Sequence, residues 1–137
     1  MLIGFGAAMI GIVVALRPDD IAARTAEPTS AEDIAPIFYK NCTSCHHSGG
    51  LAPFSLVEYD SAAAYLAEMR DAITDRVMPP WQADGPPGVF RNDRRLPDSD
   101  RDKILQWIAT GAKTGDLKKL PPKPQYASSW EIGTPDL

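Results

Sequence analysis

Cys42, Cys45 and His46 are the residues whose types and spacing point most clearly to a chemistry. Two cysteines separated by two residues and followed directly by a histidine form the attachment signature of a c-type haem. Each thiol adds across one vinyl group of the porphyrin. The next residue then lies under the iron, where a neutral imidazole nitrogen can bind it. Residues 42–46 therefore predict one haem c, attached through Cys42 and Cys45 and bound at the iron by His46.

A Cys-x-x-Cys pair also occurs in thioredoxin-like redox proteins and in zinc sites. The first requires a βαβ setting, and a tetrahedral zinc site requires two further ligands, whereas this chain has no other cysteine. Haem attachment uses both cysteines and also accounts for His46. No cysteine is then left for a disulfide that would report on the redox compartment.

Met78 is the predicted second axial ligand. It stands before Pro79 and Pro80, which cannot continue a helix and so place it at the head of a rigid, extended turn. A soft, neutral thioether stabilises ferrous iron and raises the reduction potential. Two other methionines lie in the N-terminal apolar stretch. Met69 lies on the apolar face of an expected helix, where methionine usually fills gaps.

Three further residues lie close to these ligands in the sequence. A metal-bound imidazole donates its other nitrogen to an acceptor, and the carbonyl of Pro53 is the expected acceptor for His46. Trp81 is expected to pack, and its indole could hydrogen-bond a haem propionate. His47 adjoins the proximal ligand, cannot reach the opposite face of the same haem, and is expected at the surface.

Three helices are expected to position these groups. The first starts near Ser30, with Asp33 reaching back to complete the cap, and delivers the cysteines. The second covers residues 60–77, where apolar residues recur at helical spacing. The third is expected to be capped by Asp98 or Ser99 and to end at Gly111. We expect Trp107 and Ile108 of the third helix to meet Ile37 and Phe38 of the first.

The remaining segments are expected to be irregular. Residues 82–97 carry Arg91, Arg94 and Arg95, which either face a propionate or an acidic partner or belong to a solvated loop; we expect the solvated loop. Residues 113–125 are rich in lysine and proline and are expected to form an extended tail. Its lysines either steer an acidic partner or are simply solvated.

The first 16 residues are apolar and carry no charge. They have about the length of a signal-peptide core and fall short of the roughly 20 residues that a spanning helix needs. A cleaved signal peptide or a retained N-terminal membrane anchor is expected, which places the protein outside the cytoplasm, in the periplasm. We divide the chain into this leader (1–24), one domain (25–120) and a proline-rich tail (121–137).

Length and charge limit the remaining possibilities. A chain of 137 residues allows one small domain. The formal net charge is -4, from 14 basic and 18 acidic residues, so no basic surface for nucleic acid is expected. Thirteen prolines and ten glycines with normal apolar content indicate a loop-rich globular protein.

The sequence from about Ser30 onward resembles a class I monohaem cytochrome c. The resemblance rests on Cys-Thr-Ser-Cys-His, on Ala-Pro-Phe-Ser-Leu at 52–56, and on Met-Pro-Pro-Trp at 78–81. More narrowly, the chain is similar to the cytochrome c module found in bacteria ahead of copper type II ascorbate-dependent monooxygenase-like or redoxin-like domains. This resemblance implies a small all-α fold, about three helices plus long loops around one haem, with His46 and Met78 as axial ligands. Residues 130–137 are similar to the junction where longer members enter their next domain.

The expected function is electron transfer between periplasmic redox partner proteins, without an enzymatic reaction of its own. Two alternatives stay open. The chain could be the electron-feeding module of a larger oxidoreductase, or its sixth iron position could open for peroxide or for a sensed ligand. The sequence favours the electron carrier, because Met78 is placed to close the site.

Overall fold

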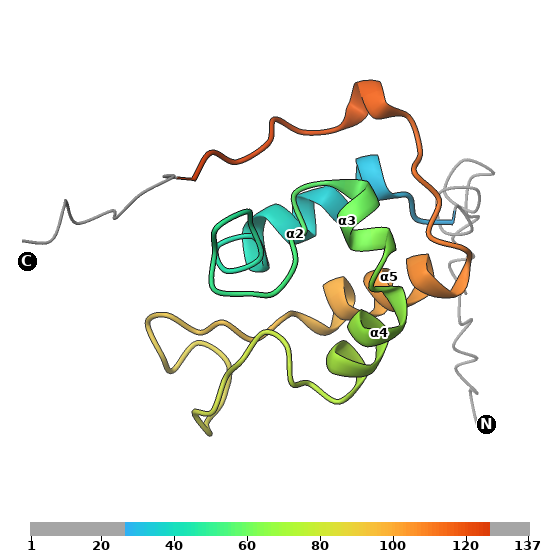
Figure 1. Ribbon diagram of the computed structural model, residues 1–137. Helices are drawn as coiled ribbons and strands as arrows, with labels where there is room; N and C mark the ends of the chain where they lie inside the picture. The colour runs from blue at the N-terminus through green and yellow to red at the C-terminus, as the bar shows by residue number, and fades with distance from the viewer. Residues whose placement is uncertain (1–26, 127–137) are drawn as a thin grey trace, which may run out of the picture.

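The computed structural model describes residues 27–126 (Figure 1). Within this range the secondary structure is helical and contains no strand, so the expectation of an all-α chain is confirmed there. No helix of this part is long and apolar enough to cross a membrane. The expected leader and the expected interdomain junction both lie outside the described residues.

The first helix begins as a π-helical turn, η1 (Ser30–Ile34), and continues as α2 (Ala35–Asn41). Asp33 reaches back as predicted, but it accepts a hydrogen bond from the Thr29 amide, at 2.9 Å, because the cap residue is Thr29. The amides of Ser30 and Ala31 donate to carbonyls of residues 113 and 114, at 2.8 and 2.9 Å. A distant segment therefore supplies acceptors to the free amides at this helix start.

The prediction of a single helix over residues 60–77 is wrong. The chain forms α3 (Tyr59–Ala63) and α4 (Leu66–Thr74), separated at Tyr65, whose φ of -126° and ψ of 30° leave the helical region. At this break the Tyr65 ring stacks on Phe54, with centroids 4.1 Å apart and planes at 10°. Tertiary stacking thus accompanies a break that the apolar spacing does not reveal. The described residues contain four α-helices rather than about three.

The last α-helix, α5, covers Asp98–Ala109. Its cap residue is Pro97 and no side chain caps it, although Asp98 or Ser99 had been expected to do so. Gly111 has a φ of +92°, a left-handed conformation that glycine adopts at no steric cost, and it ends the helix as predicted. A short 3-10 helix, η2 (Leu117–Lys119), follows.

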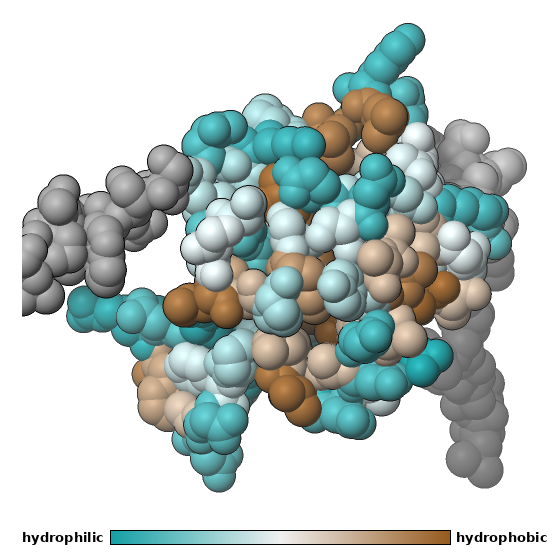
Figure 2. Space-filling model, viewed as in Figure 1, coloured by the Kyte–Doolittle hydropathy of each residue, from teal (hydrophilic) through white to brown (hydrophobic). Residues whose placement is uncertain are grey.

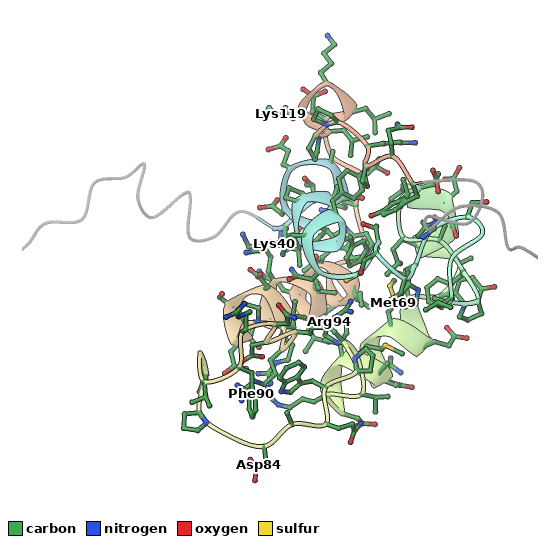
Figure 3. All side chains as sticks on the ribbon, turned by 90° about the vertical axis from the view of Figure 1, so that its left-hand side faces the viewer. Lys40, Met69, Asp84, Phe90, Arg94 and Lys119 are labelled. Carbon is green, nitrogen blue, oxygen red and sulfur yellow. The ribbon has the colours of Figure 1, made fainter. Side chains whose placement is uncertain are left out.

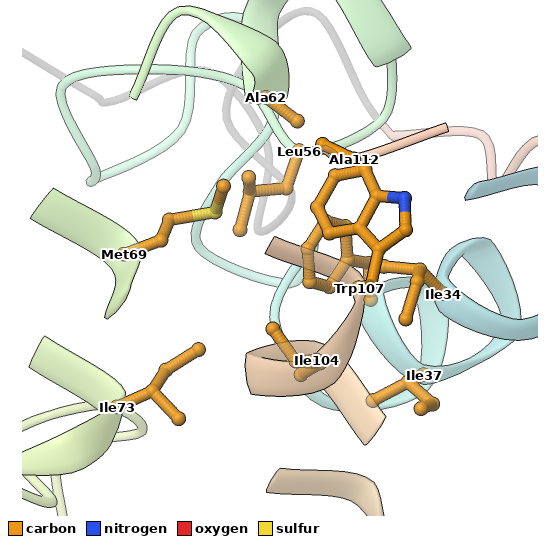
Figure 4. Close-up of a cluster of buried hydrophobic side chains, with 10 residues drawn as sticks. Ile34, Ile37, Leu56, Ala62, Met69, Ile73, Ile104, Trp107 and Ala112 are labelled. Atoms are coloured by element: carbon orange, nitrogen blue, oxygen red, sulfur yellow. The ribbon is translucent and has the colours of Figure 1, made fainter. Parts of the chain in front are cut away.

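The core lies where η1, α2, α4 and α5 meet (Figure 4). Ile34, Ile104 and Trp107 are fully buried. Phe38 meets Trp107 edge to face, with centroids 6.1 Å apart, as predicted. Ile37 belongs to the same cluster and Ile108 packs against it. The indole of Trp107 donates to the carbonyl of Lys113 at 3.0 Å, so its polar atom is satisfied inside the core.

The segment after α5 returns along the outside of the helices (Figure 1). Three exposed ion pairs join it to the body: Lys113 with Glu27, Lys119 with Glu32, and Lys123 with Glu58. At its described end, Tyr126 donates to the Thr43 hydroxyl at 2.6 Å and stacks on His47, with centroids 4.0 Å apart. Residues 113–126 therefore form a strap that is fastened at both ends, and several of its lysines are paired.

Candidate functional site

A cavity of roughly 440 Å³ collects most of the residues that the sequence had singled out. Its walls come from the end of α2 with residues 42–56, from α4, and from the loop that follows α4. The volume lies within the roughly 300–1,000 Å³ typical of cofactor and ligand sites. Much of its lining is apolar, including Leu51, Leu56, Ala72, Ile73 and Leu96.

The segment that carries both cysteines turns tightly out of α2. The amides of Cys42 and Thr43 both donate to the Phe38 carbonyl, at 2.8 and 3.0 Å, and those of Cys45 and His46 donate to the Cys42 carbonyl. Thr43, between the cysteines, is fully buried and donates to the Tyr39 carbonyl at 3.1 Å. This turn brings both thiols and the imidazole to one wall of the cavity.

The two cysteines do not form a disulfide with each other. Burial, and to a smaller extent the neighbouring Cys45, raise the pKa of the Cys42 thiol to about 12. Cys42 is therefore protonated at neutral pH in this fold.

His46 places its Nδ1 atom 3.1 Å from the carbonyl oxygen of Phe54. Because a carbonyl can only accept, Nδ1 carries the hydrogen and Nε2 keeps its lone pair. Burial lowers the pKa of His46, and the hydrogen bond to Phe54 partly opposes this shift. The ring is thus a neutral imidazole with Nε2 available to bind a metal.

The acceptor for His46 had been expected at Pro53, and this assignment is wrong by one residue. The Ala52 amide donates to the Cys45 carbonyl and the Leu56 amide donates to the His46 carbonyl, so the loop is held at both ends. With those ends fixed, the carbonyl that reaches the imidazole belongs to Phe54. Pro53 contributes to the site differently, by lining the cavity.

Two methionines line the cavity, one more than predicted. Met78 enters from the loop after α4, is 40% exposed, and has its amide bonded to the Ala72 carbonyl at 3.2 Å. Met69 lies on α4, is 5% exposed, and belongs to the core cluster, as its helical spacing predicted (Figures 3 and 4). The sequence did not indicate that this core position also borders the cavity.

Some apolar side chains at this site are exposed. Leu51 lines the cavity and is 94% exposed, and Val77 beside Met78 is 58% exposed. In the face shown by Figure 2, hydrophobic residues form separate groups among hydrophilic ones. A group bound in the cavity would cover apolar surface that is otherwise in contact with water.

Trp81 lies beside the main cavity rather than in it. It borders an adjoining pocket of roughly 180 Å³ that shares Met78 and Pro79 with the cavity. Its indole N–H is buried and has no hydrogen-bond partner, while its ring packs edge-on against Phe90. A buried donor without an acceptor is costly, so this position suits an acceptor supplied by a bound group.

The three arginines of the loop differ from one another. Arg91 is exposed, as expected. Arg95 turns into its own loop, where it pairs with Asp93 and donates to the Gly85 carbonyl at 2.7 Å. Arg94 is also exposed, but it lines the cavity and donates to the Ser44 hydroxyl at 3.0 Å (Figure 3). The expectation of a solvated loop missed both contacts, because an irregular segment has no periodicity from which contacts can be inferred.

His47, which had been expected at the surface, is partly buried, stacks on Tyr126 and does not line the cavity. Within residues 27–126, no group of three or more His, Cys, Asp or Glu side chains comes together to hold a metal ion. Comparison of the whole chain with family models, with curated proteins and with solved structures gave no match.

Proposed function

We propose that this protein is an exported c-type cytochrome that passes single electrons between redox partner proteins. Haem c is attached through Cys42 and Cys45, and His46 and Met78 bind its iron. The observation that carries this proposal is the cavity itself, where both thiols and the imidazole meet a methionine from a separate segment. The small cytochrome c-like fold around one haem is part of the same proposal.

The residues present fit this group. The apolar lining suits a large aromatic macrocycle, and the tautomer of His46 leaves Nε2 as the metal-binding atom. The buried indole of Trp81 lacks an acceptor beside the cavity, which a carboxylate such as a haem propionate would provide. When bound, haem c supplies an iron that exchanges one electron between its ferric and ferrous forms.

The protein's own groups would then have defined tasks. The thiols of Cys42 and Cys45 anchor the cofactor, and the Phe54 carbonyl orients the His46 ring through Nδ1. The thioether of Met78 would bind the iron from the other wall of the cavity, which would raise the reduction potential. With His46 and Met78 both binding the iron, electron transfer would require no general base or nucleophile from the protein.

The exposure of Met78 supports a second candidate. A thioether that is 40% exposed can be displaced more easily than a buried one, so a sixth position that opens for peroxide or a sensed ligand is a reasonable alternative. The electron-feeding module of a larger oxidoreductase would use the same closed site as the electron carrier.

An optical spectrum of the purified protein tests the proposal. Covalently bound haem with the weak far-red charge-transfer band of thioether-ligated ferric iron is expected. The band should disappear in Met78→Ala and persist in Met69→Ala, the matched control, since both side chains line the cavity. Loss of the band in Met69→Ala alone would reassign the ligand. High-spin iron that binds carbon monoxide in the unmodified protein would favour the open site.

A further inference from the structure

Besides α4, the cavity has two walls that come from distant parts of the chain. Residues 42–56 form one wall and carry the cysteines and His46, and the loop of residues 78–97 forms the other and starts at Met78. In Figure 1 both segments project from the same side of the helices. Whether Met78 stays over the site depends on what holds the second wall against the first.

The loop of residues 78–97 is braced internally. Trp81 packs against Phe90 across the loop, with centroids 5.6 Å apart. Arg95 donates to the carbonyls of Gly85 and Pro86, at 2.7 and 3.2 Å, and pairs with Asp93. These contacts join the start, middle and end of the loop, so we expect it to move largely as one body.

The two ends of the loop are held by the helices on either side. The Met78 amide donates to the Ala72 carbonyl near the end of α4, and Leu96 packs against the core just before α5. Arg76 and Asp98, on either side of the loop, form an exposed ion pair at 2.9 Å. These contacts lie next to α4 and α5, which leaves the rest of the loop free to hinge about them.

Arg94 crosses from the loop to the other wall. Its Nη2 atom donates to the Ser44 hydroxyl at 3.0 Å and lies 4.0 Å from the Cys45 sulfur. Within the described residues, these are the polar contacts that join residues 78–97 to residues 42–56. The hydrogen bond therefore joins the loop to Ser44, the residue directly before Cys45.

We propose that Arg94 is a positioning residue, a latch that holds the Met78 loop closed against the haem-attachment segment through Ser44. The inference rests on the proposed ligation by His46 and Met78. Arg94 touches neither axial ligand, and it acts by restraining the braced loop that begins at Met78. When the latch is broken, the loop opens more often and an external ligand competes better for the sixth position.

The experiment measures the affinity of the ferric, haem-loaded protein for imidazole, together with its far-red band. Breaking one hydrogen bond of this kind changes an equilibrium by about 2- to 12-fold, so Arg94→Met should bind imidazole several-fold more tightly. Arg94→Lys keeps a donor for Ser44 and should recover much of the original affinity. Arg91→Met, which removes an exposed arginine of the same loop, is the control and should leave the affinity unchanged.

The Ser44→Ala variant distinguishes a latch from an effect of the positive charge of Arg94 alone. It removes the acceptor and leaves the arginine in place, so a latch predicts the same gain as Arg94→Met and no further gain in the double variant. If Arg94→Met shifts the reduction potential while Ser44→Ala leaves imidazole binding unchanged, Arg94 acts through its charge and the latch is wrong.

The failure of the latch differs from the failure of the proposed function. An unmodified protein without covalent haem or without the far-red band refutes the proposed function, and the latch with it. A protein that shows both signals, but whose Arg94→Met and Ser44→Ala variants bind imidazole as the unmodified protein does, refutes the latch alone.

Discussion

The two walls of the cavity are held in different ways. The attachment wall, residues 42–56, is held by backbone hydrogen bonds to α2, by the buried Thr43, and by Tyr126 of the strap. The Met78 loop, residues 78–97, is held mainly by contacts within itself and by Arg94. The fixed wall carries Cys42, Cys45 and His46, and the more independent wall carries Met78, the ligand that we propose can be exchanged.

The largest expected contrast is in the free energy of unfolding, when one aromatic residue next to each wall is replaced by alanine. Phe38 lines the cavity, is 4% exposed and packs on Trp107, so Phe38→Ala should lower the free energy of unfolding by about 3–5 kcal/mol. Phe90 packs on Trp81 within the loop and is only partly buried, so Phe90→Ala should cost about 1 kcal/mol. Chemical denaturation of both variants measures this, and equal losses would contradict the comparison.

A methyl group added to Gly50 tests how tightly the attachment wall is packed. The new Cβ would clash with the Cys45 carbonyl oxygen and would lie 2.9 Å from the His47 ring. The carbonyl is backbone that already accepts from the Ala52 amide, so Gly50→Ala should cost about 1–3 kcal/mol. The same denaturation measurement detects it.

Gly88→Ala in the other wall is the counterpart of that substitution. A Cβ at Gly88 meets nothing within 4 Å, so its cost comes only from a φ of +84°, about 1 kcal/mol. A larger loss for Gly88→Ala than for Gly50→Ala would reverse the order of rigidity that we assign to the two walls.

Removing one hydroxyl tests the contribution of the strap to the attachment wall. Tyr126→Phe loses the hydrogen bond to the buried Thr43 hydroxyl but keeps a ring that can stack on His47. A loss of about 0.5–1.5 kcal/mol is expected, seen as a fall of a few degrees in Tm. Tyr65→Phe is the control, since the Tyr65 hydroxyl has no hydrogen-bond partner among the described residues. A similar fall in Tm in the control would mean that the strap bond adds nothing.

The smallest expected effect is that of low pH on the stability of the Met78 loop. Hydrogen bonds from Arg95 lower the pKa of Asp93 to about 2, below the ordinary value of an aspartate. Since the folded pKa is the lower one, the pair stabilises the loop above about pH 4, and the contribution is lost as the pH falls toward 2. Asp93→Asn should therefore lower Tm slightly at pH 5, and the difference should be much smaller at pH 2. A difference of the same size at both pH values would assign the effect to something other than this carboxylate.

The local sequence was sufficient for several features. Cys42, Cys45 and His46 are neighbours in the chain, so the turn after α2 brings them together without help from distant residues. The apolar spacing around Trp107 predicted its meeting with Phe38, and Gly111 predicted the end of α5. Each of these follows from periodicity or from backbone freedom, which act over a few residues.

Other features were decided by contacts between distant residues. The break at Tyr65 goes with its stacking on Phe54, and the start of η1 depends on carbonyls of residues 113 and 114. Phe54 rather than Pro53 accepts from His46, because hydrogen bonds at both ends of the loop fix which carbonyl reaches the ring. Spacing along the chain cannot resolve a shift of one residue in such a loop.

By itself, the sequence determined the helical class of residues 27–126 and the chemistry offered by Cys42, Cys45 and His46, since residue type and near-neighbour spacing are properties of the chain. Only the tertiary structure decided that Met69 borders the same cavity as Met78 and that Arg94 reaches Ser44. The reason is physical: segments far apart in the chain meet only when the core has fixed the directions in which they leave their helices.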